Sequence, residues 1–188
     1  MNINLSLKHI LPLSLLLLMA CVTNVNASPQ HASTFKTLNS NVGQQPHKET
    51  IAQQKMINYA RKNIGIPYVW GGTSPSGFDC SGFIKYIYNH FNISIPRTTA
   101  AYTQLFKHSI SLKDAKVGDL IVFTGTNLKI RRPGHAGIIT EIKPGLVKFI
   151  HSSSSKKHFG VTETSYYQSG YPKRYLTVIR MPNPTIKE

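Results

Sequence analysis

The chain has 188 residues, which is enough for one folded domain with appended segments. Its 22 Lys and Arg residues against 7 Asp and Glu give a formal net charge of +15, so we expect a polyanionic partner. The alternative is a solvated basic surface with no specific partner. The apolar run over residues 10–20 is far shorter than the roughly 20 residues that a membrane-spanning helix needs, which excludes such a helix there.

The start of the chain has the features of a secretory signal. Residues 18–21, Leu-Met-Ala-Cys, resemble a bacterial lipoprotein box, in which the cysteine is lipidated after cleavage. We therefore expect a signal peptide over residues 1–20 and a lipid anchor on Cys21. Val22 follows this cysteine, which by resemblance to lipoprotein sorting favours the outer membrane, with the protein facing the periplasm. The alternative is cleavage after Ala27, which releases a soluble periplasmic or secreted protein.

The compartment of an exported protein limits which polyanion its positive charge can meet. An exported protein rarely meets nucleic acid, so we expect a carboxylate-bearing cell wall or an anionic membrane surface, and no nucleic acid. Residues 21–48 are rich in Ser, Asn, Gln and His without apolar periodicity, which predicts a flexible tether. A folded domain is predicted over residues 49–182, followed by a short tail over residues 183–188.

A helix that begins with a cysteine is predicted over residues 80–92. Its apolar residues recur at helical spacing: Phe83, Ile84, Ile87, Tyr88 and Phe91. Asp79 is a suitable N-cap. A thiol at a helix N-terminus meets the positive end of the dipole and unpaired N–H groups, which favour the thiolate and can hold an oxyanion. Cys80 has no disulfide partner, because Cys21 is acylated or removed; it is a candidate nucleophile or else a buried small apolar residue.

The remaining predicted elements give a helical first half and a strand-rich second half. Helices are predicted over residues 51–63, with Gly65 as C-cap, and from a cap at residues 96–99 through Phe106. Short β-branched runs separated by Gly, Pro or polar turns predict the strands: residues 120–123, 136–142, 146–151, 161–164 and 176–180. Helices followed by an antiparallel sheet indicate the α+β class.

Two histidines lie in the predicted sheet. His135 opens one strand and His151 closes the next, so a hairpin through residues 143–145 would bring both imidazoles near the same end. A nucleophile on a helix N-terminus, a base on a strand and a third polar residue on the next strand are the parts of an activated cysteine. A zinc site explains these residues less well, because they lack the short-spaced pairs typical of zinc ligands.

Five ordered motifs make the pattern specific. They are Pro67-Tyr68-Val69-Trp70-Gly71-Gly72, Asp79-Cys80-Ser81-Gly82-Phe83, Gly118-Asp119-Leu120, Gly134-His135-Ala136-Gly137-Ile138 and Ile150-His151. Over about residues 50–182 this order resembles the NlpC-type family of bacterial cell-wall cysteine peptidases. The resemblance implies a papain-like α+β fold, in which N-terminal helices pack on an antiparallel β-sheet, and a reaction without metal or organic cofactor.

The resemblance also implies roles for individual residues. Cys80 would be the nucleophile, His135 the base and His151 the residue that orients the base. Tyr68 matches a family tyrosine whose hydroxyl helps to shape the oxyanion site.

Other motif positions carry weaker implications. Asp79 and Ser81 match positions that the family uses near the substrate, whereas Asp119 and Trp70 are expected to be structural. The basic loop over residues 129–132 is longer than the motif demands; it either grips carboxylates or is simply solvated.

By resemblance, the expected activity is that of a peptidoglycan endopeptidase acting through a thioester acyl-enzyme. The bond would join D-Ala to diaminopimelate in the cross-link or D-Glu to diaminopimelate in the stem. Two alternatives stay open: an acyltransferase or amidase that uses the same Cys and His, and a wall-binding module without catalysis.

Overall fold

The first helix begins at a capping box. In the computed structural model, which describes residues 50–185, α1 spans Ile51–Arg61. The Thr50 hydroxyl accepts a hydrogen bond from the Gln53 N–H, while the Gln53 side chain accepts one from the Thr50 N–H. The helix is capped at Lys62 and ends before the expected C-cap, Gly65, which instead adopts a positive φ in the turn beyond it.

The second helix, α2 (Cys80–His90), begins where the sequence predicts. Asp79 is its N-cap, and its carboxylate accepts a hydrogen bond from the Gly82 N–H at 2.6 Å. The Gly72 carbonyl accepts from the Asp79 N–H at 3.0 Å, and a Cβ at Gly82 would clash with the same carbonyl. Because Gly82 has no side chain, the first turn of α2 packs directly on the preceding loop and Cys80 is held in place.

Four 3-10 helices complete the helical content of the described residues. The predicted helix through Phe106 is the 3-10 helix η1 (Thr99–His108), and its N-cap residue Thr98 makes no side-chain cap bond. The other three are η2 (Leu112–Asp114), η3 (Lys156–His158) and η4 (Tyr171–Arg174). Within residues 50–185 there is no helix whose length and apolar character would let it cross a membrane.

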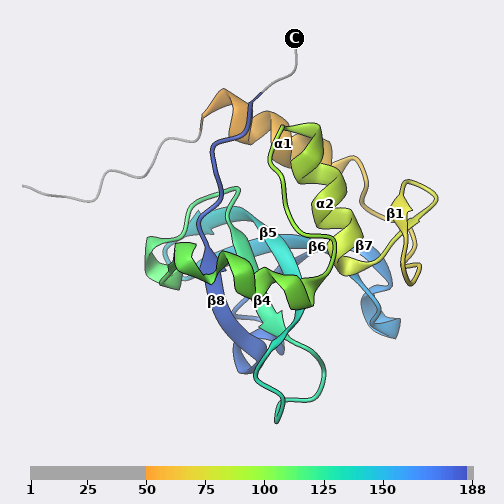
Figure 1. Cartoon of the computed structure of the whole chain (residues 1–188), viewed down its shortest axis with the longest axis vertical. Coiled ribbons are helices and arrows are strands. Elements are labelled where there is room, and N and C mark those ends of the chain that lie inside the picture. Colours follow the sequence, from red (N-terminus) through yellow and green to blue (C-terminus); the bar gives the residue numbers. More distant parts are fainter. Residues whose placement is uncertain (1–49, 186–188) are drawn as a thin grey trace, which may run out of the picture. The chain divides into compact units, whose positions relative to one another are not determined.

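An antiparallel sheet with the order β3-β8-β4-β5-β6-β7 forms the second half of the domain (Figure 1). Its strands are β3 (Ser109–Ile110), β4 (Leu120–Thr124), β5 (Pro133–Lys143), β6 (Leu146–Ser153), β7 (Gly160–Ser165) and β8 (Tyr175–Ile179). The five predicted strands are therefore confirmed. Sequence reasoning missed β3 and the small hairpin of β1 (Thr73–Ser74) and β2 (Gly77–Phe78), because two residues carry no periodicity.

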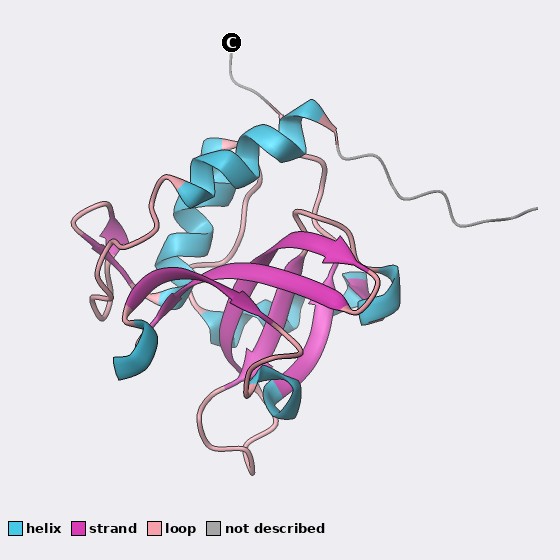
Figure 2. Ribbon diagram, turned by 180° about the vertical axis from the view of Figure 1, so that it is seen from behind, coloured by secondary structure: helices cyan, strands magenta, loops and turns pink. Residues whose placement is uncertain are grey.

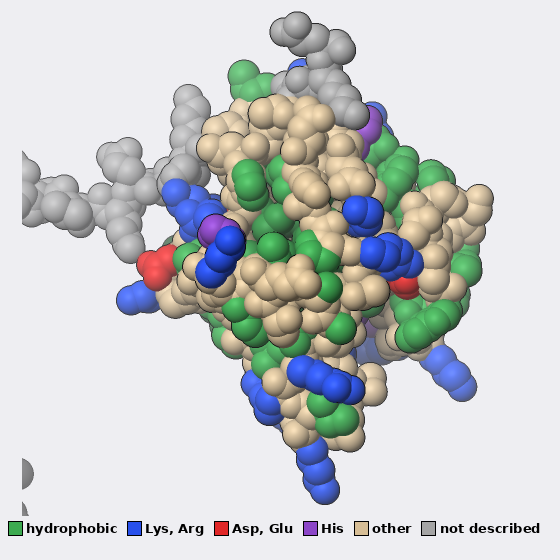
Figure 3. Space-filling model, in the orientation of Figure 1, with side chains coloured by type: hydrophobic (Ala, Val, Ile, Leu, Met, Phe, Trp, Pro, Cys, Tyr) green, Lys and Arg blue, Asp and Glu red, His purple; other side chains and the backbone are tan. Residues whose placement is uncertain are grey.

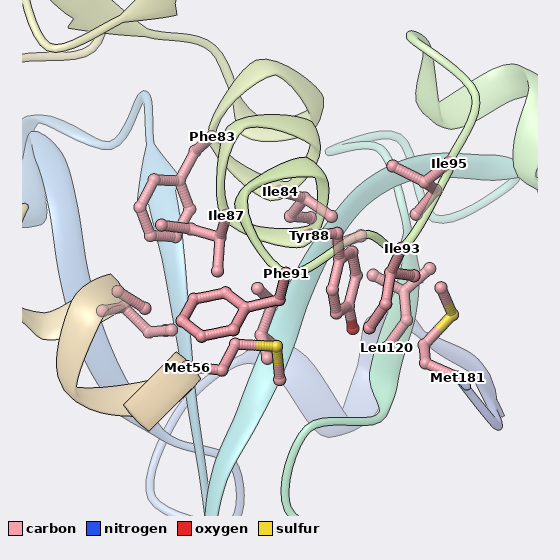
Figure 4. Packing of buried hydrophobic residues seen from close by; sticks show 14 of the residues in the cluster. Met56, Phe83, Ile84, Ile87, Tyr88, Phe91, Ile93, Ile95, Leu120 and Met181 are labelled. Atoms are coloured by element: carbon pink, nitrogen blue, oxygen red, sulfur yellow. The ribbon is translucent and has the colours of Figure 1, made fainter. Parts of the chain in front are cut away.

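The two faces of this curved sheet have separate apolar clusters. Both α-helices lie on one side of the sheet (Figure 2), and the buried side chains between them and the sheet include Met56, Phe83 and Leu120 (Figure 4). The opposite face carries a second cluster that includes Phe123 and Phe149. Burial of these side chains is the main favourable contribution to folding. The α+β class predicted from the sequence is confirmed.

On the face seen in Figure 3, Lys and Arg are widely scattered and acidic side chains are few. The predicted signal peptide, the lipid anchor on Cys21 and the tether lie outside the described residues, and the predicted domain boundaries stay predictions.

Candidate active site

One cavity of about 940 Å³ collects most of the residues that the sequence analysis selects. Its lining includes Tyr68, Asp79, Cys80, Ser81 and His135. Cys80 is the first residue of α2 and His135 is the third residue of β5, so the cavity lies between a helix N-terminus and the sheet. Residues that are 55 positions apart in the chain, Cys80 and His135, thus share one solvent-accessible space.

His151 lies directly beside His135. Nε2 of His135 and Nδ1 of His151 are 2.8 Å apart, so one nitrogen donates a hydrogen bond and the other accepts it. Nε2 of His151 lies 3.0 Å from the Thr164 hydroxyl on β7. Since β5 and β6 pair through the turn at residues 143–145, the expected proximity of the two imidazoles is confirmed. Both rings are almost fully buried.

Two residues of η4 cover this histidine pair. The Tyr171 hydroxyl lies 3.2 Å from Nε2 of His135 and 3.5 Å from Nδ1 of His151. The guanidinium of Arg174 lies 4.9 Å from the Tyr171 ring centre and donates to the Thr124 carbonyl at 2.8 Å. Both residues also line the cavity. Sequence reasoning missed them, because the Tyr-Pro-Lys-Arg segment resembles an ordinary surface turn.

The resting thiol is protonated. Burial raises the pKa of Cys80 to about 11, and the negative charge of Asp79 acts in the same direction. The N–H groups of Ser81 and of Cys80 itself lower this pKa, as does the charge of Arg97, but they do not outweigh burial. The N–H groups at the helix start thus favour the thiolate, as the sequence analysis expects, but burial outweighs them in the free site.

Both histidines are neutral at ordinary pH. Burial lowers the pKa of His135 well below 6.5, and charge interactions with His151 and Arg174 lower it further. Burial also lowers the pKa of His151 to about 3, with contributions from Arg174 and His158. The site therefore holds a neutral thiol and two neutral imidazoles, and the positive charge of Arg174 acts on both imidazoles.

Arg97 ties the start of α2 to the preceding loop. Its guanidinium donates to the Asp79 carboxylate at 2.7 and 3.1 Å, to the Ser81 hydroxyl at 3.0 Å and to the Gly71 carbonyl at 3.0 Å. Burial would raise the pKa of Asp79, but hydrogen bonds from Arg97 and Gly82 and the charge of Arg97 lower it overall. Asp79 and Ser81 thus position Cys80 as well as lining the cavity. Arg97 was not selected from the sequence.

Of the two motif residues that are expected to be structural, one is buried and hydrogen-bonded and the other is exposed. Asp119 is buried and accepts hydrogen bonds from the Lys116 N–H, the Met181 N–H and Arg180, so its structural role is confirmed. Trp70 is 89% exposed and lines the active-site cavity, which does not fit the structural role expected of it.

Tyr68 borders the cavity close to the nucleophile. Burial raises the pKa of its hydroxyl, and the nearby Cys80 and Asp79 raise it further, so the hydroxyl stays a proton donor at neutral pH. No group of three His, Cys, Asp or Glu side chains is placed to hold a metal ion among residues 50–185.

An α+β domain with a free cysteine at a helix start and a histidine pair on the sheet matches a known family. The NlpC/P60 family is matched over residues 65–180, more than half of the chain. The chain therefore belongs to the NlpC/P60 family.

Two curated relatives come from Bacillus subtilis (strain 168). "Probable peptidoglycan endopeptidase LytE" is 38% identical over 118 residues, which cover 62% of this chain and 32% of the relative. "Gamma-DL-glutamyl hydrolase" is 35% identical over 133 residues, which cover 69% of this chain and 29% of the relative. The match thus spans about a third of the length of each of these relatives.

Solved structures have the same fold. An NlpC/P60 family protein from Bacillus cereus ATCC 10987 is 31% identical with a TM-score of 0.59, covering 70% of this chain and 41% of that chain. The NlpC/p60 domain of the peptidoglycan hydrolase SagA is 28% identical with a TM-score of 0.54, covering 69% of this chain and 98% of that domain.

Proposed function

We propose that this protein is a peptidoglycan endopeptidase that cleaves a peptide bond with Cys80 as nucleophile, His135 as base and His151 as the orienting residue. The observation that carries the proposal is geometric: Cys80 and His135 line one cavity, and His135 is held by His151 at 2.8 Å. The printed names of relatives and structural neighbours, peptidoglycan endopeptidase and peptidoglycan hydrolase, support the substrate class.

The hydrogen bonds around His135 favour one arrangement of protons. Within residues 50–185, both hydrogen bonds of the His135 ring use Nε2, so Nδ1 is the nitrogen left to face the thiol. In the proposal, Nε2–H of His135 donates to Nδ1 of His151, and Nε2–H of His151 donates to the Thr164 hydroxyl. This relay keeps a lone pair on Nδ1 of His135, which is what a general base needs.

The reaction begins from the neutral pair. The Cys80 proton passes to Nδ1 of His135 as Sγ bonds to the substrate carbonyl carbon. The imidazolium then gives this proton to the leaving nitrogen while the C–N bond breaks, and a thioester remains. A water molecule, deprotonated by the same imidazole, attacks the thioester, which releases a carboxylic acid and returns the proton to sulfur.

Developing negative charge needs donors near Cys80. The N–H groups of Cys80 and Ser81 at the start of α2 face the sulfur, and helix N-termini stabilise anions. The Tyr68 hydroxyl supplies a further donor from the cavity wall. Together they are the proposed oxyanion site.

Two bonds fit this proposal, D-Ala to diaminopimelate in the cross-link and D-Glu to diaminopimelate in the stem. The relative named "Gamma-DL-glutamyl hydrolase" supports the second bond, because D-Glu is joined in the stem through its γ-carboxyl group.

The test is digestion of purified sacculi, with the new termini assigned by mass spectrometry and a Cys80→Ala variant as control. Loss of cross-linked dimers identifies the cross-link, and shortened dipeptide stems identify the D-Glu bond. Acyl transfer or deamidation would appear as modified stems with no new amine termini, and the absence of new amine termini would overturn the peptidase proposal. Sacculus binding without any covalent change would indicate a wall-binding module.

The cell-envelope location is part of the same proposal. It rests on the Leu-Met-Ala-Cys box that ends at Cys21, and on a substrate that lies outside the cytoplasm. In this proposal the lipid on Cys21 holds the domain at the outer membrane, facing the periplasm, while cleavage after Ala27 would leave it soluble.

A further inference from the structure

A second cavity, of about 630 Å³, adjoins the active-site cavity. The two share Gly125 and Thr126, which follow β4, and Gly134, the second residue of β5. The loop between β4 and β5 hangs at the lower end of the molecule in Figure 1. The two cavities therefore adjoin at these three residues.

Arg132 is the one charged side chain among the residues that line the second cavity. The others are neutral: Ala100, Thr103, Gly125, Thr126, Asn127, Ile130, Pro133 and Gly134. Within residues 50–185, Arg132 is exposed and has no hydrogen bond or ion pair. It brings a positive charge to a cavity whose lining supplies no carboxylate to neutralise it.

Neighbouring arginines are already engaged. In the active-site cavity, Arg97 is paired with Asp79, and Arg174 donates to a backbone carbonyl. Arg131 donates to the carbonyls of residues 173 and 175, the second at 2.6 Å. Among these arginines, Arg132 is thus the guanidinium free to bind a ligand, and a guanidinium binds carboxylates through paired N–H groups.

The chemistry of the reaction indicates which part of the substrate reaches Arg132. His135 must give its proton to the leaving nitrogen, so the leaving amine lies on the His135 side of Cys80. The second cavity opens on that side, because Gly134 precedes His135 directly in β5. The residue released as the amine therefore lies toward the cavity that Arg132 lines.

We propose that Arg132 binds a free carboxylate of the residue that leaves as the amine. This inference rests on the proposed function and makes it more specific. Both candidate bonds release an amine of diaminopimelate, which has two amino and two carboxyl groups, so in either case one carboxylate lies outside the chain of peptide bonds. The aliphatic chain of this residue fits a lining that includes Ile130 and Pro133, and its carboxylate meets Arg132.

The experiment compares substrates that differ in this one group. The full-length chain is given the stem tetrapeptide and its cross-linked dimer, each with the outlying diaminopimelate carboxyl group either free or amidated. We expect the wild type to prefer the free carboxylate by on the order of 10-fold in kcat/KM, mainly through KM, as for one charge-assisted hydrogen-bonded pair. Arg132→Gln should reduce this ratio to about 1, and Arg132→Lys should retain part of it.

Two controls make the outcome decisive. Lys129→Gln removes a charge from the same loop at a residue that does not line the cavity, so it should keep the wild-type ratio. Dissociation constants of the same peptides for the Cys80→Ala chain test the subsite without catalysis. Tighter binding of the free carboxylate together with no cleavage by the wild type would contradict the proposed function but support the carboxylate subsite at Arg132. Equal dissociation constants, or an unchanged ratio in Arg132→Gln, would overturn the subsite.

Discussion

The Tyr171 hydroxyl oxygen lies 3.2 Å from Nε2 of His135 and 3.5 Å from Nδ1 of His151, at the point where the two rings meet. One hydroxyl thus contacts both partners of the bond that holds the base. The ring of Tyr171 packs at 4.6 Å, centre to centre, on the buried Phe123 of β4, so its position is fixed by the sheet. Tyr171 is therefore placed to influence the orientation and proton arrangement of the pair.

We expect Tyr171→Phe to lower kcat by about 3- to 10-fold with little change in KM, because one net hydrogen bond is worth about 1 kcal/mol. Steady-state kinetics on stem peptides measure this split. The acid limb of the pH profile of kcat should shift as well, whereas a purely structural role of Tyr171 would leave that limb unchanged. Tyr167→Phe, at an exposed ring outside the active-site cavity, is the matched control. A change in KM alone would contradict the positioning role.

The three proposed catalytic residues should behave as one unit. Cys80→Ala and His135→Ala should each abolish turnover, and the double variant should lose little more than either single variant, because residues that act together are not additive. His151→Ala should lose on the order of 10- to 100-fold, as do other residues that orient a catalytic group. Single-turnover rates on purified sacculi measure the relative size of these losses.

The control for this order is His108→Ala, since His108 is an exposed residue at the end of η1. Full activity in a folded His135→Ala variant would refute the mechanism. A loss in His108→Ala equal to that of His151→Ala would show that the wrong histidine has been assigned.

The pH profile should report a base with a depressed pKa. Because burial and nearby charge hold the pKa of His135 well below 6.5, its neutral form persists as the pH falls through 6.5. The acid limb of kcat/KM should therefore lie below pH 6.5. Arg174→Gln removes a positive charge that lowers the pKa of both histidines, so it should shift the limb to higher pH.

Alkylation of Cys80 tests the other half of the pair. A thiol whose pKa is raised to about 11 should react with iodoacetamide at a rate that still increases above pH 9. A plateau below pH 7 would instead indicate a preformed thiolate and imidazolium.

Arg97 should be needed both for stability and for placing Cys80. Arg97→Gln leaves the Asp79 carboxylate, whose side chain is 12% exposed, without its guanidinium partner. We expect a loss of about 1 to 3 kcal/mol in the free energy of unfolding, the usual cost of a charged group left unpaired. Arg97→Lys should be intermediate, because an ammonium cannot reproduce the forked contacts.

Urea unfolding measures this loss, and Arg61→Gln is the control for the removal of one positive charge from another ion pair. Arg61 pairs with Glu163 in a more exposed setting, with side chains 39% and 22% exposed, so its loss should cost about 1 kcal/mol or less. Equal losses in the two variants would contradict a special role for Arg97.

The lipid anchor is a prediction about residues outside the described part of the chain. If Cys21 is lipidated, the full-length protein should incorporate labelled palmitate and sediment with membranes, and Cys21→Ser should abolish both. Soluble protein with an N-terminus at Ser28 would contradict the anchor. Edman sequencing or mass spectrometry of the mature protein decides between the two.

Short-range signals were sufficient for most of the fold. The cap at Asp79, the helical spacing of apolar residues in α2 and the β-branched runs of β4 to β8 each depend on residues within a few positions of one another. For this reason the sequence by itself determined the α+β class, the start of α2 at Cys80 and the proximity of the two histidines through one hairpin. The five ordered motifs also indicated the family.

Tertiary structure alone decided how these residues are held and charged. Tyr171 and His135 are 36 positions apart, and Arg97 and Asp79 are 18 apart, so no local pattern connects them. The raised pKa of Cys80 is the sum of burial by many neighbours and of opposing charges and N–H groups. Desolvation depends on every group packed around an atom, whereas a helix cap or an apolar periodicity depends only on neighbours in the chain. For this reason the sequence predicted the helices and strands, while the pKa values of the site residues required the tertiary structure.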